Sequence, residues 1–227
     1  EVDFKKEVVL PLHPYVLGVM LGDGAMSGLS TCLSTSDDYI KSRFPELGFP
    51  LTKLTHGKYD YYVKGLQKET RDLEVRKTSY YKEIPSLYLE ASIDERYELS
   101  KGLMDSDGYV SKEGKCYLTT VSEKMVDHVA YLVRSLGGTA TKTSKTPTYS
   151  HKGEKKEGVK AYTLLIRHPN KTKIVSLPRK LERLKKDKLV SNRIKSVEYT
   201  CKDEATCISI SGSRKLFVID NFIVTHN

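Results

Sequence analysis

The chain has 227 residues, of which 38% are hydrophobic and 30% charged, a balance that excludes a disordered chain and predicts one large domain or two modest ones. The net charge is +9, and the segment 139–195 alone holds 17 Lys/Arg against 4 Asp/Glu. This asymmetry favours a polyanion such as nucleic acid as partner, although a solvated basic surface fits the charge about equally well.

No apolar run reaches the roughly 18 residues of a membrane span, so we expect no membrane partner. The four cysteines show neither zinc-site spacing nor the density of a disulfide framework. We therefore expect a reducing compartment, with the protein cytoplasmic or associated with DNA inside the cell.

The first half of the chain opens with an apolar run, Pro14–Gly24 (PYVLGVMLGDG), that predicts a helix beginning at a proline and ending in Asp-Gly. Residues 1–9 before it suggest a linker or a strand. The elements expected after it are a strand at 29–35, a helix at 37–47, a hairpin within 51–66 turning at His56-Gly57, and a helix within 69–81.

The second half repeats this order. Ser92 and Glu95 form a capping-box pattern that opens a second helix, which ends in the Asp-Gly run Glu98–Gly108 (ELSKGLMDSDG). The expected elements that follow are a strand at 116–122, an amphipathic helix at 123–136, and a hairpin of 139–148 with 159–167 around a polar tip at 151–158. The repeat predicts two halves related by a pseudo-twofold axis.

The two Asp-Gly helices share a pattern of small residues four apart, Gly18 with Gly22 and Gly102 with Ser106. This spacing places the small residues on one helical face, where another backbone can approach closely. The glycine after each aspartate fits the left-handed position that ends a helix. Asp23 and Asp107 then lie where unpaired carbonyl oxygens gather, so together they predict a site for a divalent cation.

The last part of the chain changes character near residue 189. Short apolar runs with tight links predict a separate all-β element with strands at 194–199, 206–211, 216–219 and 222–224. The sequence ends in Thr225-His226-Asn227.

These motifs resemble those of the LAGLIDADG homing endonucleases that are embedded in inteins. The segments LGVMLGDG and SKGLMDSDGYV match the two family motifs, supported by Lys82-Glu83-Ile84-Pro85-Ser86 and Arg134-Ser135-Leu136-Gly137 at the expected places. The closing FVIDNFIVTHN resembles the C-terminal splicing block of inteins. Together the resemblance covers roughly residues 10–227.

The resemblance implies an α+β fold of two αββαββα halves joined to a small all-β C-terminal intein (Hint) segment. It places a linker or residual Hint strand at 1–9, the endonuclease domain at 10–188 with halves of about 10–91 and 92–188, and the splicing segment at 189–227. It implies a monomer that cuts both strands of double-stranded DNA at a long asymmetric site.

For the nuclease site, the resemblance implies that Asp23 and Asp107, with the adjoining Gly22 and Ser106, hold Mg²⁺ (or Mn²⁺). Lys82 and Lys180 match the family's basic active-site residues, which stabilise the charged transition state or polarise water. The register of Lys82 is anchored by the Ile-Pro-Ser that follows, whereas a slip from Lys180 to Lys185 stays open. Thr120 is a further candidate at the edge of the site.

For splicing, the resemblance implies that Asn227 cyclises onto its own carbonyl while His226 assists, and that Cys207 helps the branching step. Cys207 fits a small buried core residue equally well. The first splicing block and the downstream nucleophile are missing, so an N-terminal intein fragment is the implied partner. Two alternatives stay open: a DNA- or RNA-binding relic without catalysis, and the C-terminal half of a split intein acting mainly in trans splicing.

Overall fold

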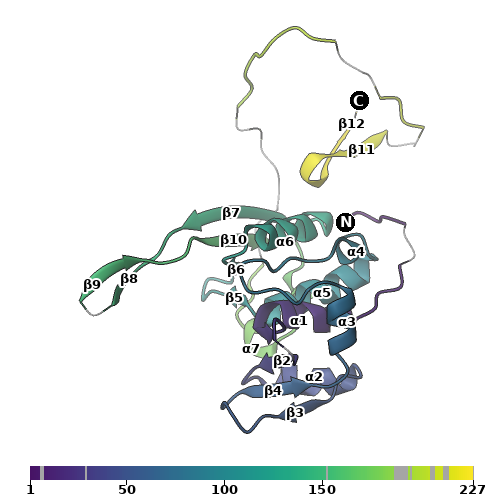
Figure 1. Cartoon of the computed structure of the whole chain (residues 1–227). Helices are drawn as coiled ribbons and strands as arrows, with labels where there is room; N and C mark the ends of the chain where they lie inside the picture. Colours follow the sequence, from purple (N-terminus) through teal and green to yellow (C-terminus); the bar gives the residue numbers. More distant parts are fainter. Residues whose placement is uncertain are drawn as a thin grey trace.

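The computed structural model describes residues 1–5, 8–28, 30–151, 153–186, 194, 196–204, 208–211 and 215–226. The first half contains α1 (Pro14–Asp23), β1 (Gly24–Ala25), β2 (Cys32–Ser34), α2 (Asp38–Glu46), β3 (Leu51–Lys53), β4 (Asp60–Val63) and α3 (Gln67–Asp72). Its sheet has the strand order β1-β2-β4-β3. Figure 1 shows this half at the lower end of the molecule.

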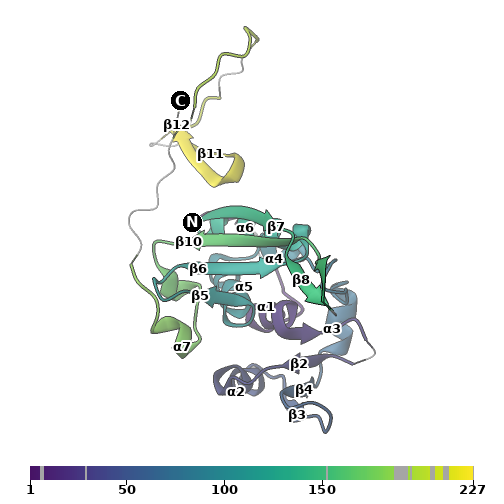
Figure 2. The ribbon, with the colours of Figure 1, turned by 90° about the vertical axis from the view of Figure 1, so that its left-hand side faces the viewer.

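The second half repeats that arrangement. After the short helix α4 (Ser86–Leu89) come α5 (Ile93–Asp105), β5 (Gly108–Val110), β6 (Cys116–Thr120), α6 (Glu123–Ser135), β7 (Thr139–Lys145), β10 (Ala161–Arg167), a 3₁₀ turn (Lys171–Lys173) and α7 (Pro178–Leu181). Its sheet order, β5-β6-β10-β7, corresponds strand for strand to that of the first half, and all pairs are antiparallel. Apart from two further strands between β7 and β10, namely β8 (Thr148–His151) and β9 (Glu154–Glu157), both halves therefore carry the αββαββα order in a mixed α/β fold (Figure 2).

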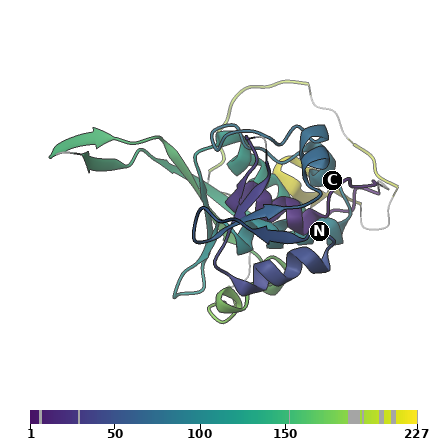
Figure 3. The same cartoon turned by 60° about the horizontal axis from the view of Figure 1, so that its bottom comes forward.

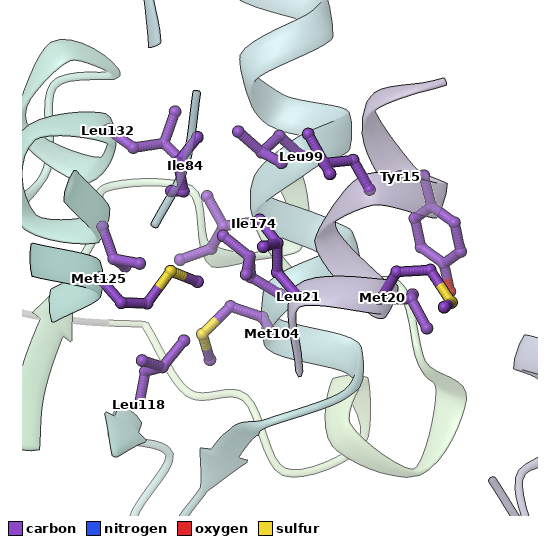
Figure 4. Packing of buried hydrophobic residues seen from close by; sticks show 14 of the residues in the cluster. Tyr15, Met20, Leu21, Ile84, Leu99, Met104, Leu118, Met125, Leu132 and Ile174 are labelled. Atoms are coloured by element: carbon purple, nitrogen blue, oxygen red, sulfur yellow. The ribbon is translucent and has the colours of Figure 1, made fainter. Parts of the chain in front are cut away.

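The two Asp-Gly helices, α1 and α5, pack against each other in the centre. Eight of the ten residues of α1 are buried, because neighbours cover this helix on all sides. A Cβ atom added to Gly18 would lie 2.5 Å from the carbonyl oxygen of Leu99, and one added to Gly102 would lie 2.2 Å from that of Tyr15. The predicted close approach of the two backbones is confirmed, and it requires glycine at both positions. Figure 4 shows the apolar side chains around this contact.

The local signals at the other helices explain why they form. Ser92 and Glu95 make the predicted capping box at the start of α5. The helix α6 begins at Ser122, whose hydroxyl accepts from the backbone of Met125 at 3.2 Å, and it turns an apolar face to the core. The prediction of this amphipathic helix is confirmed.

Three expectations are wrong in detail. The helix predicted within 69–81 is replaced by α3, which ends because Glu74 adopts a left-handed backbone (φ 55°). The polar tip at 151–158 is not a loop, since it forms a second ribbon of β8 (Thr148–His151) and β9 (Glu154–Glu157). The glycines after the two aspartates are not left-handed: Gly24 has φ −85°.

The C-terminal part forms fewer strands than predicted. A hairpin of β11 (Leu216–Ile219) and β12 (Ile223–His226) flanks a 3₁₀ turn (Asp220–Phe222), and it docks on α6 through Phe222, whose ring lies 4.7 Å from that of Tyr131. The described residues of the segments 194–199 and 206–211 form no strand. No helix within the described ranges is long and apolar enough to cross a membrane.

The α1–α5 contact gives a test of the fold. We expect Gly102→Ala to destabilise the protein by roughly 1–3 kcal/mol, because the new methyl group would force the two backbones apart. Thermal unfolding measures this, with Gly28→Ala as the matched control, since a Cβ at Gly28 meets nothing within 4 Å. Equal melting temperatures for the two variants would contradict the packing described here.

Candidate active site

Asp23 and Asp107 lie where the ends of α1 and α5 meet. Asp23 is the last residue of α1, and Asp107 comes two residues after α5 ends. A Cβ atom added to Gly22 would lie 2.2 Å from Ser106 Oγ and 3.2 Å from the amide nitrogen of Asp107, so the two helix ends are in contact. This contact brings the two aspartates of the separate halves to one place.

The glycines that follow the aspartates are needed for space. A Cβ atom added to Gly24 would lie 2.3 Å from the carbonyl oxygen of Met20, and one added to Gly108 would lie 2.5 Å from that of Met104. The chain therefore turns out of each helix directly against its last turn. A glycine follows each aspartate because the backbone there lies too close to the last helical turn to leave room for a Cβ atom, and this holds in both halves.

Each helix end carries a lysine that binds its carbonyl groups. Lys82 Nζ donates to the carbonyl oxygens of Leu21, Gly22 and Gly24 at 2.7, 3.0 and 3.2 Å. Lys180 Nζ lies 2.6–3.2 Å from the carbonyl oxygens of four residues at the end of α5, namely Met104, Asp105, Ser106 and Gly108. The two lysines therefore occupy equivalent places in the two halves.

The structure distinguishes between the two alternatives for the second lysine. Lys180 is buried at the end of α5, whereas the side chain of Lys185 is exposed. The backbone of Lys185 instead lies beside Gly114, and its carbonyl oxygen accepts from Lys171 Nζ at 3.0 Å. Of the two, Lys180 is the one brought to the site.

The charges at the site oppose one another. Burial raises the pKa of Asp23 to about 6, and the neighbouring Asp107 adds to the rise while both lysines oppose it. Burial also raises the pKa of Asp107 against the effect of the same two lysines, although the residue remains exposed to solvent. Two neighbouring carboxylates with raised pKa values are costly to ionise together, and a bound cation would stabilise their ionised forms.

The same burial acts on the lysines in the opposite sense. It lowers the pKa of Lys82, and it lowers that of Lys180 to about 8. The neighbouring carboxylates oppose this fall, Asp107 and Asp23 for Lys82, and Asp105 and Asp23 for Lys180. An ammonium has three N–H donors, and three or more carbonyls surround each one, so both lysines act here as fixed positive charges.

The donor set fits a hard divalent cation. Two carboxylates suit Mg²⁺, which usually takes one or two carboxylates and completes its shell with water and phosphate oxygens. Within the described ranges no group of three His, Cys, Asp or Glu side chains is placed to hold a metal, so a site of the zinc type is not formed there. The carbonyls of Gly22 and Ser106 face the lysines, at 3.0 and 3.2 Å.

Asp105 fixes the segment that delivers Lys180, a role that sequence reasoning missed. Its buried carboxylate accepts from the backbone N–H groups of Ser176 and Leu177, both at 2.9 Å, and from the hydroxyls of Ser176 and Tyr15. The signal that could have revealed it is a carboxylate at the position where the first Asp-Gly motif has an apolar residue. In the first half Leu21 occupies the corresponding position, so Lys82 is held by other means.

Lys82 is braced by the other half of the protein. The hydroxyl of Ser122, at the start of α6, donates to the carbonyl oxygen of Lys82 at 2.6 Å, and the amide of Ile84 donates to His128 Nδ1 at 3.2 Å. Glu83 forms ion pairs with Lys77 and Lys124. These contacts hold the Lys82 segment against α6.

Lys180, in the second half, is positioned through a contact with the first half. Its neighbour Arg179 makes a bidentate pair with Asp37, at 2.9 and 2.7 Å, at the residue that precedes α2 in the first half. Each lysine is therefore positioned partly by the half of the protein to which it does not belong. Nothing in the one-dimensional pattern links Arg179 to Asp37, since 142 residues separate them.

Thr120 lies beside this site. A cavity of about 240 Å³ is lined by Lys82, Asp107 and Thr120, together with Leu21, Gly22, Ser79, Leu103, Leu118, Thr119, Val121, Met125 and Ala161. The hydroxyl of Thr120 accepts from the amide of Ser122 at 3.2 Å, which ties it to the brace of Lys82. The structure thus brings together Asp23, Asp107, Lys82, Lys180 and Thr120.

The residues predicted for splicing are elsewhere. His226 lies at the end of β12 and pairs with Leu216 of β11, in the hairpin that docks on α6. Figure 1 shows this hairpin on the far side of α6 from α1. Cys207 and Asn227 lie outside the described residues.

A family model matches part of the chain. Residues 83–180 match the model described as homing endonuclease, and the match covers less than half of the chain. The matched segment contains Asp107 and Lys180.

Two relatives match parts of the chain. A replicative DNA helicase DnaB of Mycobacterium intracellulare is 29% identical over 175 residues, which are 77% of this chain and 26% of the relative. A homothallic switching endonuclease of Saccharomyces cerevisiae is 37% identical over 71 residues, which are 29% of this chain and 12% of the relative. The chain thus spans about a quarter of the first relative's length and about an eighth of the second's.

Solved structures give a weaker likeness. The homing endonuclease I-DmoI in complex with DNA and Ca has a TM-score of 0.45 at 14% identity, with 75% of this chain and 95% of that chain covered. Mesophilic variants of I-DmoI give 0.44 at 16% identity, with 75% and 91% covered. Because these TM-scores lie below 0.5, we draw no conclusion from them.

The raised pKa of Asp23 predicts a pH-dependent stability. The folded protein binds this proton more tightly than the unfolded chain, whose aspartates titrate near 3.8, so stability falls as the pH rises from about 4 through 6. We expect Asp23→Asn to raise the melting temperature at pH 8 without metal by about 4–8 °C, for a gain of roughly 2 kcal/mol. The gain should vanish below about pH 4.

The control for this measurement is Asp72→Asn, which changes an exposed aspartate at the end of α3. Its melting temperature should follow that of the unchanged protein at both pH values. A variant Asp23→Asn that melts like the unchanged protein at pH 8 would contradict the burial of this carboxylate.

Proposed function

We propose that this chain is a metal-dependent endonuclease that cuts both strands of DNA at a specific site. The observation that carries the proposal is the pair of carboxylates, Asp23 and Asp107, at touching helix ends, each of which binds the ammonium group of a lysine. Two equivalent half-sites, one from each half, suit a substrate that has two equivalent backbones to cut.

The chemistry follows from the charges. A phosphodiester resists attack because it is itself anionic. A bound Mg²⁺ or Mn²⁺ would supply Lewis acidity, which would offset that charge and lower the pKa of the attacking water. Asp23 and Asp107 would hold the cation. Lys82 and Lys180 keep positive charge at fixed points behind the carboxylates, which lowers the repulsion of the incoming phosphate and stabilises the charge that develops in the transition state.

The proposed partner is double-stranded DNA with a long asymmetric site, bound by a monomer. The basic segment 139–195 supplies β7, β10 and α7 of the second half, and antiparallel strands of this kind can enter a DNA groove. The two halves differ in sequence, so they would read different bases.

The comparisons support an insertion within a host protein. The name of the yeast relative describes an endonuclease, whereas the name of the mycobacterial relative describes a helicase, of which only 26% is matched. An endonuclease embedded in a host protein accounts for both matches. On this basis we propose that the chain comes from an intein, and that its target is the joined, insertion-free version of the flanking sequence.

Cleavage of that joined sequence tests the proposal. We expect the unchanged chain to cut it in Mg²⁺ or Mn²⁺, and Asp23→Asn or Asp107→Asn to slow double-strand cleavage by about 10²–10³-fold, as for loss of one electrostatic stabiliser. The readout is linear product on a plasmid substrate, with Asp72→Asn as the control.

Metal binding gives a second readout that does not depend on cutting. Mg²⁺ should raise the melting temperature of the unchanged chain at pH 8 and leave that of the Asp23→Asn, Asp107→Asn double variant unchanged. Cleavage retained by this double variant would overturn the proposed site. Tight, salt-sensitive DNA or RNA binding without cleavage in either metal would instead establish the non-cleaving relic.

We further propose that residues 189–227 are the C-terminal splicing segment of the intein. The β11–β12 hairpin, which ends with His226 next to the terminal Asn227, supports this assignment. In this role His226 would assist the cyclisation of Asn227, Cys207 would help the branching step, and an N-terminal intein fragment would be the partner that supplies the first nucleophile.

Trans splicing tests this second activity. A fusion with a Cys and a reporter after Asn227, mixed with the N-terminal intein fragment, should give a ligated product detectable by mass. His226→Ala and Asn227→Ala should each abolish the product, whereas His56→Ala, in the β3–β4 loop, should not. If the fusion made with the unsubstituted chain remains uncleaved in the presence of the N-terminal intein fragment, the splicing role is contradicted.

A further inference from the structure

The second half carries a ribbon that the first half lacks. β7 and β10 pair as far as Lys145 with Ala161, and the chain then continues through Pro147 and Gly158, joined by a backbone hydrogen bond of 2.7 Å, into β8 and β9. We call residues 145–160 the arm. Figures 1 and 3 show it projecting away from the rest of the molecule.

The arm has no core of its own. Residues 145–150 and 153–157 are all exposed, and Tyr149, the large apolar side chain of β8, is 53% exposed. An isolated two-stranded ribbon is marginally stable in water, because it has no face to bury. Because its described residues are not packed against the rest of the chain, the ribbon would be stabilised most by contact with the surface of another molecule.

The charge of the arm identifies the class of that surface. Its sequence holds five lysines against two glutamates. In β9, Lys155 and Lys156 point to opposite faces of the ribbon, because successive residues of a strand alternate. The register places Lys155 opposite Ser150 and Lys156 opposite Tyr149, so each face presents a cation, and each face also carries one glutamate of β9. The five lysines and two glutamates leave the arm as a whole with a net positive charge, which suits a groove with a phosphate backbone on each side.

The arm makes the protein asymmetric. In the first half the equivalent strands, β3 and β4, are joined by residues 54–59 alone, without a further ribbon. From Lys145 to His151 the arm spans about seven residues, or roughly 20 Å at the rise of a strand. At about 3.4 Å per base pair, this reach corresponds to roughly 6 base pairs.

We propose that the arm binds the phosphate backbones of duplex DNA beyond the sheet of the second half, and so lengthens the contacted site on that side only. The inference rests on the proposed DNA-binding function and adds an interaction surface to it. The arm would raise affinity and fix the orientation of the enzyme on the duplex, while the carboxylates stay at the centre.

Two variants test the proposal. In one, Thr148–Glu157 is replaced by Asn-Gly, the favoured turn for a two-residue hairpin connection, which keeps β7 and β10. In the other, Lys155→Gln and Lys156→Gln leave the ribbon intact. The control is Lys68→Gln with Arg71→Gln, which removes two exposed charges from α3, outside both sheets.

Backbone footprinting on the duplex that the intact chain cuts is the first measurement. The shortened variant loses the four residues of β8, roughly 13 Å of reach, so we expect it to lose about 4 base pairs of protection on one flank and none on the other. The salt dependence of binding is the second: the double lysine variant should lower the slope of log K against log salt by about 2, since each phosphate contact contributes about 0.9. The control should leave both unchanged.

The outcomes separate the two proposals. Arm variants that keep the full footprint and the full slope, while the intact chain cuts DNA, would overturn the role of the arm alone. An intact chain that neither cuts nor protects duplex DNA would overturn the proposed function, and this inference with it. Symmetric loss of protection on both flanks would also contradict the arm, because it projects from one half.

Discussion

The structure depends on how closely the backbones of α1 and α5 approach each other. Gly18 and Gly102 leave no room for a methyl group, and Gly22 and Ser106 continue the contact to the helix ends. The two helices touch along the whole face that carries the small residues. Asp23, the last residue of α1, therefore lies close to Ser106 and Asp107, which follow α5. The carboxylates therefore owe their proximity to backbone packing, and no loop has to bring them together.

That convergence creates an electrostatic problem that the lysines partly solve. Two carboxylates and two sets of helix-terminal carbonyls concentrate negative charge in a partly buried place. Lys82 and Lys180 neutralise the carbonyls, yet the pKa of Asp23 remains raised to about 6, so the protein is left with an unsatisfied demand for positive charge. Ionisation of Asp23 therefore lowers the free energy of unfolding, at the place where the proposed cation and phosphate would bind.

Much of this site could be predicted from local sequence. The Asp-Gly runs, the spacing of their small residues and the capping box at Ser92 all act over one or two helical turns, where pattern and physics coincide. The conformation of Gly24 could not, because the steric limit against Met20 appears only once the chain has turned out of the helix. Lys180 was ambiguous for a related reason, since its partners come from a helix 75 residues away. The ribbon of β8 and β9 was missed because a strand without a core shows no apolar alternation.

The braces of the two lysines also limit how the halves can be exchanged. Arg179 depends on Asp37, and the Lys82 segment depends on Ser122 and His128, so each half contains part of the support for its neighbour's site. A chimera that joins one half of this chain to a half from another protein would keep both carboxylates and both helices. It would nevertheless lose the alignment of its lysines unless these cross-half pairs were transplanted as units.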